Sequence, residues 1–259
     1  MTTIEALILG LIQGLTEFLP VSSSGHIEIG KAILGVNVPD SLEFTIAVHA
    51  ATVLSTLVVF RKDIISLFSG LFKFKMNSET QFVLKLLLST IPVLVVGVFF
   101  KEDVEKLFEG NLLIVGVMLL VTAALLTLSR FLQKTQTKPI SYRTSLIIGL
   151  AQAVAVLPGL SRSGSTISTG LMLGNNRDEV AKFSFLMVII PILGAAMLDL
   201  LKGEFGSVSS SSILAGFVAA FVSGYLACSW MVKLVRKGNL VGFAVYCAAV
   251  GVVAIISAL

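Results

Sequence analysis

The chain has 259 residues, of which 56% are hydrophobic and 13% charged, and its mean hydropathy is +0.98. Soluble globular proteins usually have about 25% charged residues, so this composition excludes a water-soluble domain and indicates an integral membrane protein. The net charge of +4 comes without a basic patch interleaved with aromatic residues. We therefore expect no nucleic-acid partner, and we assign the charge a role in orienting the chain in the lipid bilayer.

The chain begins with two short apolar segments, 4–19 and 23–35, that are separated by the polar stretch FLPVSSSGH at 18–26. Neither segment is long enough to cross about 30 Å of hydrocarbon, which takes about 20 helical residues. Irregular backbone at membrane depth is tolerated only inside protein or beside water. The pattern therefore predicts a re-entrant helical hairpin, and three membrane spans follow it at about 41–60, 82–100 and 111–132.

The second half of the chain repeats the first. A shift of 139 residues aligns LILGLIQGLTEFLPVSSSG (7–25) with LIIGLAQAVAVLPGLSRSG (146–164) without a gap. Polar and glycine positions coincide, which is much less expected by chance than a match of apolar residues. The second half is therefore predicted to form a hairpin of 142–157 and 162–174, followed by spans at about 179–201, 211–233 and 239–258.

The odd number of spans in each half sets the topology. A hairpin returns to the side it left and three spans do not, so the second half is inverted relative to the first. The connections at 61–85, 130–143 and 233–238 are basic, whereas 101–109 is acidic and 202–212 nearly neutral. By the positive-inside rule, the basic connections are cytoplasmic and both termini lie outside. The predicted fold is an all-α polytopic membrane protein with six transmembrane helices plus two re-entrant helical hairpins, forming a single membrane domain (1–259) with repeats at about 1–135 and 140–259.

The two breaks carry the polar residues that are candidates for binding and catalysis, and the inverted repeat is expected to bring the two breaks together. Helix N-termini, serine hydroxyls and the guanidinium of Arg162 suit an anion, above all phosphate. Glu17 repels an anion unless a divalent cation, Mg²⁺ or Ca²⁺, bridges the two, and Gln13 lies one turn earlier on the same helix face. His26 is a candidate general acid or base, and a neighbouring serine a candidate nucleophile. Helix capping by the serines and a structural Glu17–Arg162 ion pair are the alternative interpretations.

Other polar or special residues are predicted to be structural. Cys228 and Cys247 lie in apolar segments without metal-ligand spacing, which predicts two buried thiols. His49 is predicted to form a hydrogen bond to a neighbouring helix, and Pro191 to kink its span. A transporter or flippase for a phosphorylated lipid or another anion is the rival class, because inverted repeats with broken helices are a common transporter plan.

Two stretches carry a resemblance to a known family: the Gln13-x-x-x-Glu17 run leading into FLPVSSSGH, and LPGLSRSGST at 157–166. Over essentially the whole chain, the sequence resembles the undecaprenyl-pyrophosphate phosphatases, also known as bacitracin-resistance proteins. The resemblance implies an enzyme of the bacterial cytoplasmic membrane that hydrolyses undecaprenyl pyrophosphate to undecaprenyl phosphate and phosphate. It further implies recycling of the lipid carrier for peptidoglycan synthesis, bacitracin resistance, dependence on a divalent cation and an active site that faces outward.

The resemblance also assigns roles by position. The catalytic set is Glu17, Ser23, His26 and Arg162, and the cation ligands are Glu17 and Gln13, where many family members have a second glutamate. The expected phosphate-binding residues are Ser22, Ser24, Gly25, Ser161, Arg162, Ser163, Gly164 and Thr166. The attacking group stays open between Ser23 and a water activated by Glu17 or His26. The expected partners are the polyprenyl pyrophosphate and the bilayer, and a homodimer is among the states that the sequence allows.

Overall fold

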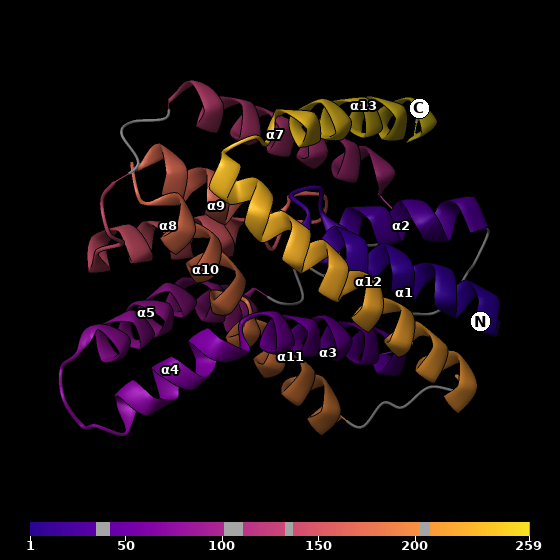
Figure 1. Cartoon of the computed structure of the whole chain (residues 1–259). Helices are drawn as coiled ribbons and strands as arrows, with labels where there is room; N and C mark the ends of the chain where they lie inside the picture. Colours follow the sequence, from indigo (N-terminus) through magenta and orange to yellow (C-terminus); the bar gives the residue numbers. More distant parts are fainter. Residues whose placement is uncertain (35–41, 101–110, 133–136, 203–207, 259) are drawn as a thin grey trace.

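The computed structural model describes residues 1–34, 42–100, 111–132, 137–202 and 208–258. Within these ranges the chain is helical, and the extended pairing amounts to one isolated bridge between Lys138 and Asn175. The helices are α1 (Thr3–Phe18), α2 (Ser23–Leu34), α3 (Leu42–Val59), α4 (Arg61–Leu71), α5 (Ser78–Phe99), α7 (Leu112–Phe131), α8 (Tyr142–Val154), α9 (Arg162–Met172), α10 (Arg177–Met187), α11 (Ile189–Lys202), α12 (Ser210–Lys237) and α13 (Val241–Ala258). Figure 1 shows both chain termini at the same end of the molecule.

Each half of the chain opens with two short helices around a break, as the sequence predicts. A capping box of Thr2 and Glu5 starts α1, and the helix ends at Phe18 because Leu19 precedes a proline and is held in the extended region (φ −71°, ψ 144°). A second capping box, built on Ser141, starts α8. With 16 and 12 residues, α1 and α2 are about 24 and 18 Å long at 1.5 Å per residue.

Five helical stretches are long and apolar enough to cross a bilayer: α5, α7, α10 together with the start of α11, α12 and α13. A sixth is present if α3 and α4 together make one broken span, bent by 77° around Phe60. The sequence prediction had a basic loop where α4 lies, so that part of the prediction was wrong. The cause is that α4 has only 11 residues and mixed polarity, and it therefore gives no spanning signal. The acidic connection predicted at 101–109 lies outside the described residues.

The predicted span at 179–201 is interrupted at Val188, between α10 and α11. Pro191 lies one turn further on, and because proline has no N–H it cannot bond to the carbonyl of Met187. The helix is therefore divided near Pro191, while the stretch Arg177–Leu198 still counts as one candidate span, and the kink at Pro191 stays a prediction.

The two halves of the chain pack on each other through their first helices. α1 lies along α12, α8 lies along α5, and α7 pairs with α13. A Cβ atom added at Gly10 would collide with the backbone of Gly216, and one added at Gly149 with the backbone of Ser89. Glycine is needed at these two positions because only a bare Cα allows such close contact.

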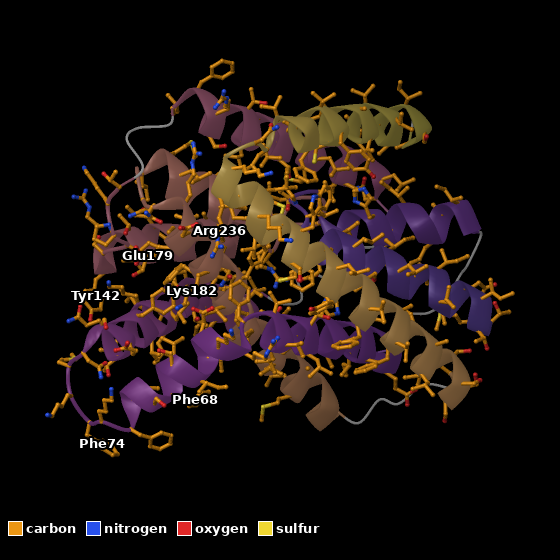
Figure 2. All side chains as sticks on the ribbon, viewed as in Figure 1. Phe68, Phe74, Tyr142, Glu179, Lys182 and Arg236 are labelled. Carbon is orange, nitrogen blue, oxygen red and sulfur yellow. The ribbon has the colours of Figure 1, made fainter. Side chains whose placement is uncertain are left out.

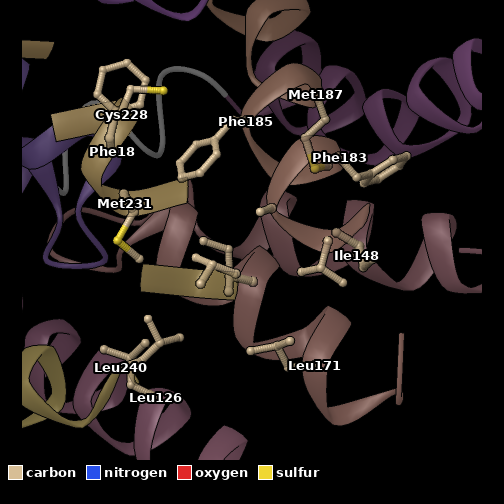
Figure 3. Packing of buried hydrophobic residues seen from close by; sticks show 14 of the residues in the cluster. Phe18, Leu126, Ile148, Leu171, Phe183, Phe185, Met187, Cys228, Met231 and Leu240 are labelled. Carbon is tan, nitrogen blue, oxygen red and sulfur yellow. The ribbon is translucent and has the colours of Figure 1, made fainter. Parts of the chain in front are cut away.

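The largest buried apolar cluster lies beside the two breaks (Figure 3). Phe18, the last residue of α1, packs against Phe185 of α10 with ring centroids 6.0 Å apart. Both cysteines are free and fully buried, so the prediction of two structural thiols is confirmed. The core therefore holds the end of α1 in place, which fixes the backbone on which Glu17 lies.

Gly10→Ala is expected to lower the melting temperature of the detergent-solubilised protein by several degrees. Overpacking a close contact costs about 1–3 kcal/mol, and 1 kcal/mol corresponds to about 2–4 °C in a chain of this size. Gly97→Ala is the matched control, because a Cβ there meets nothing within 4 Å. We expect the control to unfold at or above the wild-type temperature; equal losses in the two variants would contradict the close contact.

Candidate active site

Glu17 lies in the last turn of α1, and its side chain is only 5% exposed. The Oε2 atom accepts a hydrogen bond from Nε2 of Gln13 (2.9 Å) and another from Oγ of Ser23 (2.7 Å). Gln13 reaches Glu17 because the two residues are four apart on one helix. Ser23 reaches it because the break folds α2 back beside α1. The carboxylate is therefore oriented from both sides of the first break.

Arg162, the first residue of α9, extends to Glu17 from the other half of the chain. Its Nη1 lies 3.6 Å from Oε1 of Glu17, and this nitrogen is buried without a hydrogen-bond partner. The side chain as a whole is one-third exposed. A buried guanidinium nitrogen without an acceptor is costly, so this arrangement is suited to receive the oxygens of an anion. Glu17 and Arg162, from opposite halves of the chain, therefore lie in contact as predicted.

Further hydrogen bonds join the two breaks to each other and to the neighbouring helices α7 and α13. Oγ of Ser163 donates to the carbonyl of Leu19 (3.0 Å), and Sγ of Cys247 lies 3.4 Å from the carbonyl of Pro20. On the second break, the hydroxyl of Thr122 accepts from the backbone N–H of Ser161 (3.0 Å). These bonds satisfy backbone groups that the broken helices would otherwise leave unpaired at membrane depth.

The serines at the breaks divide into two roles. Ser22 and Ser161 cap α2 and α9, because their hydroxyls accept from the N–H groups of Gly25 (3.3 Å) and Gly164 (3.1 Å). Ser22 has a φ of +70°, a left-handed conformation that is uncommon outside glycine. The capping interpretation is therefore correct for these two serines, and the hydroxyl of Ser23 is the one that contacts Glu17.

Neighbouring hydroxyls also bond within the breaks. The Oγ atoms of Ser24 and Ser163 each lie 3.3 Å from the hydroxyl of the cap next to them. Thr166 is 1% exposed and donates to the carbonyl of Arg162 (3.0 Å). Among the expected phosphate-binding residues, the partly exposed ones are Ser24 and Arg162, whereas the buried ones are Ser22, Gly25, Ser161, Ser163, Gly164 and Thr166.

His26 bonds away from the Glu17–Ser23 pair. Its Nδ1 lies 2.8 Å from the carbonyl of Ser22, and its Nε2 lies 2.8 Å from the hydroxyl of Tyr246 on α13. The imidazole also stacks on the Tyr246 ring, with centroids 5.6 Å apart and planes 13° apart. In this geometry Glu17 is the group in position to take a proton from Ser23. Both ring nitrogens of His26 are bonded to Ser22 and Tyr246 instead.

Sequence reasoning missed Tyr246 and gave His49 a different partner. A tyrosine inside an apolar span usually finds a hydrogen-bond partner, and that was the available signal for Tyr246. His49 bonds through Nδ1 to the carbonyl of Thr45 (2.8 Å) in its own helix α3, and not to a neighbouring helix.

Tyr246→Phe is expected to lower activity by about fivefold, since a single hydrogen bond is worth about 1 kcal/mol. The variant removes the hydroxyl that orients His26 and keeps the stacked ring. Tyr225→Phe, on α12, is the matched control and should leave the rate unchanged. The pH dependence of the rate should move in the Tyr246 variant alone, and an unchanged profile in both variants would mean that His26 has no part in the reaction.

Oxygen atoms near Glu17 fit a hard cation, although the donor set is small. Oε1 of Gln13 is buried and has no hydrogen-bond partner, and it belongs to the side chain that bonds Glu17. Across the described ranges, no group of three or more His, Cys, Asp or Glu residues converges. A cation here would therefore draw its remaining ligands from a phosphate or from water, which suits Mg²⁺ or Ca²⁺.

Fold and site define a helical, multi-pass membrane protein in which two broken helices from opposite halves of the chain enclose a carboxylate, a serine and an arginine. The comparisons identify its family. Residues 6–253 match the family described as bacitracin resistance protein BacA, and the chain belongs to this family.

Curated relatives align over nearly the full length. The undecaprenyl-diphosphatase of Bacteroides fragilis (strain ATCC 25285) is 60% identical over 257 residues, which cover 97% of each chain. Those of Parabacteroides distasonis and Bacteroides thetaiotaomicron are 58% and 57% identical, covering 98% and 100% of each chain. The alignments with these relatives therefore cover nearly the whole chain.

Proposed function

We propose that this protein is an undecaprenyl-diphosphatase, a membrane hydrolase that converts undecaprenyl pyrophosphate to undecaprenyl phosphate and inorganic phosphate. The observation that carries the proposal is the contact of Ser23 and Arg162 with one buried carboxylate, Glu17. The names of the relatives support the same activity. By this reaction the protein recycles the lipid carrier for peptidoglycan synthesis, and it confers bacitracin resistance by lowering the amount of the pyrophosphate.

The reaction begins with a nucleophile and a base already in contact. Glu17 takes the proton of the Ser23 hydroxyl as Oγ bonds to the terminal phosphorus. The bond from this phosphorus to the bridging oxygen breaks, and undecaprenyl phosphate leaves with the electron pair. Water then attacks the phosphoserine, the Ser23 oxygen recovers a proton, and phosphate is released. Arg162 stabilises the charge on the transferring phosphoryl group throughout.

A divalent cation, Mg²⁺ or Ca²⁺, completes the proposed site. Glu17 and Gln13 would hold it, and it would reduce the repulsion between the carboxylate and the phosphates. Because Gln13 is neutral, the protein supplies one anionic ligand, so we expect weaker binding of the cation than a pair of carboxylates would give.

The finer topology is also part of the proposal. We count α3 as the first span, with α4 bent away from its end by 77°, which gives six spans and two re-entrant hairpins in inverted repeats at about 1–135 and 140–259. Equivalent contacts support the repeat. The collision at Gly10 has its counterpart at Gly149, and the Ser22 cap has its counterpart at Ser161. With the basic connections in the cytoplasm, the chain lies in the bacterial inner membrane with the site and both termini facing outward.

Product analysis tests the function. Purified protein in detergent is incubated with undecaprenyl pyrophosphate, and the lipids are identified by mass spectrometry while phosphate is measured in parallel. We expect equal amounts of undecaprenyl phosphate and phosphate, formation that stops with a chelator, and recovery on adding Mg²⁺ or Ca²⁺. If the substrate binds and stays intact with every divalent cation, the protein is a carrier of phosphorylated lipids and not a hydrolase.

A further inference from the structure

A second surface, with exposed aromatic and basic side chains, lies away from the breaks on α4 and the turn that follows it. We call it the α4 surface, and it consists of Ile65, Phe68, Phe72, Lys73, Phe74, Lys75 and Met76. The bend of 77° around Phe60 turns α4 away from the direction of α3. Figure 2 shows Phe68 on α4 and Phe74 on the turn at the tip, both at the edge of the molecule.

The sequence of α4 separates apolar from polar side chains. Ile65, Phe68 and Phe72 follow one another at i, i+3 and i+7 and therefore share one stripe of the helix. A parallel stripe one position along is polar and has a lysine at each end: Lys62, Ser66, Ser69 and Lys73. A helix with adjacent apolar and basic stripes is typical of segments that lie in the membrane interface.

The side of α4 that carries neither the apolar nor the polar stripe packs against the rest of the protein. Leu67 and Gly70 are buried, and a Cβ at Gly70 would collide with the side chain of Glu79 in α5. The apolar stripe is left uncovered, because the exposed fractions of Ile65, Phe68 and Phe72 are 64%, 58% and 73%. α4 is therefore held rigidly with its aromatic side chains facing outward.

The turn after α4 presents one more aromatic ring. Phe74 is 90% exposed and has a φ of +49°, which is rare for a bulky residue. Hydrogen bonds fix the turn: Nδ2 of Asn77 donates to the carbonyl of Gly70 (2.9 Å), and Oγ1 of Thr80 donates to that of Lys75 (3.0 Å). The ring of Phe74 is thus displayed by an ordered turn.

Side chains of α4 and the following turn line an open hollow at the surface. It has a volume of about 600 Å³, and its lining residues are Phe68, Leu71, Phe72, Phe74, Lys75, Met76 and Thr80. Six of these seven side chains are uncharged, and Lys75 is the charged one. The hollow therefore suits a molecule that has a hydrocarbon part and an anionic group next to it.

The segment around the hollow carries a net positive charge. Between residues 61 and 80 there are four cations, Arg61, Lys62, Lys73 and Lys75, and two carboxylates. One of the carboxylates, Asp63, is already bound to Lys182 of α10, with 2.6 Å between Oδ1 and Nζ. The second carboxylate, Glu79, lies against Gly70. The excess positive charge attracts anionic lipid headgroups and gives no such preference for zwitterionic ones.

We propose that the α4 surface is a binding site for an anionic phospholipid of the leaflet that the basic connections face. The acyl chains lie in the hollow against Phe68, Phe72 and Phe74, and the phosphate group pairs with Lys73 and Lys75. The site is separate from the breaks, so the test of lipid binding at the α4 surface is independent of the test of phosphatase activity. It would hold α4, and through Asp63 and Lys182 also α10, at a fixed depth in the membrane.

A fluorescent reporter at Phe74 tests the site. The chain has one tryptophan, so the double variant Trp230→Phe, Phe74→Trp places the only tryptophan at the hollow. The full-length protein is reconstituted in phosphatidylcholine vesicles with increasing amounts of either brominated phosphatidylglycerol or brominated phosphatidylcholine, which quench tryptophan on contact. Because each lysine near an anionic headgroup raises binding several-fold, we expect half-maximal quenching at about tenfold less phosphatidylglycerol than phosphatidylcholine.

Two charge variants decide the result. Adding Lys73→Gln and Lys75→Gln to the reporter should abolish the preference for phosphatidylglycerol. Adding Lys233→Gln and Lys237→Gln, which also removes two exposed lysines, should preserve it. An unchanged melting temperature shows that each variant is folded. Equal quenching by the two lipids, weak quenching by both, or a preference that survives Lys73→Gln and Lys75→Gln would each overturn the proposal.

Discussion

Replacing Arg162 by alanine is expected to lower kcat/KM for phosphate release by about 10³-fold, in line with the loss of other groups that stabilise a transferring phosphoryl group. The guanidinium lies 3.6 Å from Glu17 and has a buried nitrogen without a hydrogen-bond partner. An anionic substrate would satisfy this nitrogen. Arg162→Lys should recover part of the activity, because it restores the charge without the planar pair of donors.

The matched control for Arg162 is Arg236→Ala. Arg236 is also ion-paired, through Nε to Oδ1 of Asp178 at 3.0 Å, but it is 58% exposed and lies at the end of α12. We expect it to leave kcat/KM close to the wild-type value. If Arg162→Ala is as active as Arg236→Ala, the ion pair with Glu17 is structural.

Glu17→Gln is expected to reduce kcat by about 10³-fold, within the range that a general base contributes. Glutamine keeps the size of the side chain and can still accept the Ser23 hydrogen bond. It lacks the negative charge needed to take the proton of Ser23 and to hold a cation. We expect the melting temperature to fall, because the variant leaves the partly buried guanidinium of Arg162 without its counter-charge.

Glu28→Gln is the control for Glu17. Glu28 lies in the same hairpin, where it pairs with Lys31 at 3.0 Å, and its loss should leave turnover unchanged. Full turnover by Glu17→Gln would show that the base is another group.

The sequence predicts the parts of the fold that depend on local rules. Pro20 and Pro158 stop the two opening helices near the positions where the structure ends them. The repeat of polar and glycine positions predicts that Glu17 and Arg162 come from opposite halves and meet. α4 escaped prediction because its 11 residues carry both charges and apolar side chains. The sequence of such a segment is equally compatible with a short helix and with a basic loop.

The roles of individual site residues depend on geometry that a sequence does not contain. Three serines in a row look equivalent, yet Ser22 is turned into the left-handed region and caps α2, while Ser23 points to Glu17. His26 seemed to be the natural base for a neighbouring serine, but its two ring nitrogens are taken by Ser22 and Tyr246. The partner from α13 lies 220 positions away in the chain.

The central claim is that Glu17 and Arg162, from two halves of the chain, act together on one pyrophosphate. Phosphate release by the wild type, the two single variants Glu17→Gln and Arg162→Ala, and the double variant tests it most directly. Residues that act as a unit are strongly non-additive. We therefore expect the double variant to be about as slow as the slower single variant. A double variant slowed by the product of the two single effects, or a wild type that releases no phosphate, would contradict the account.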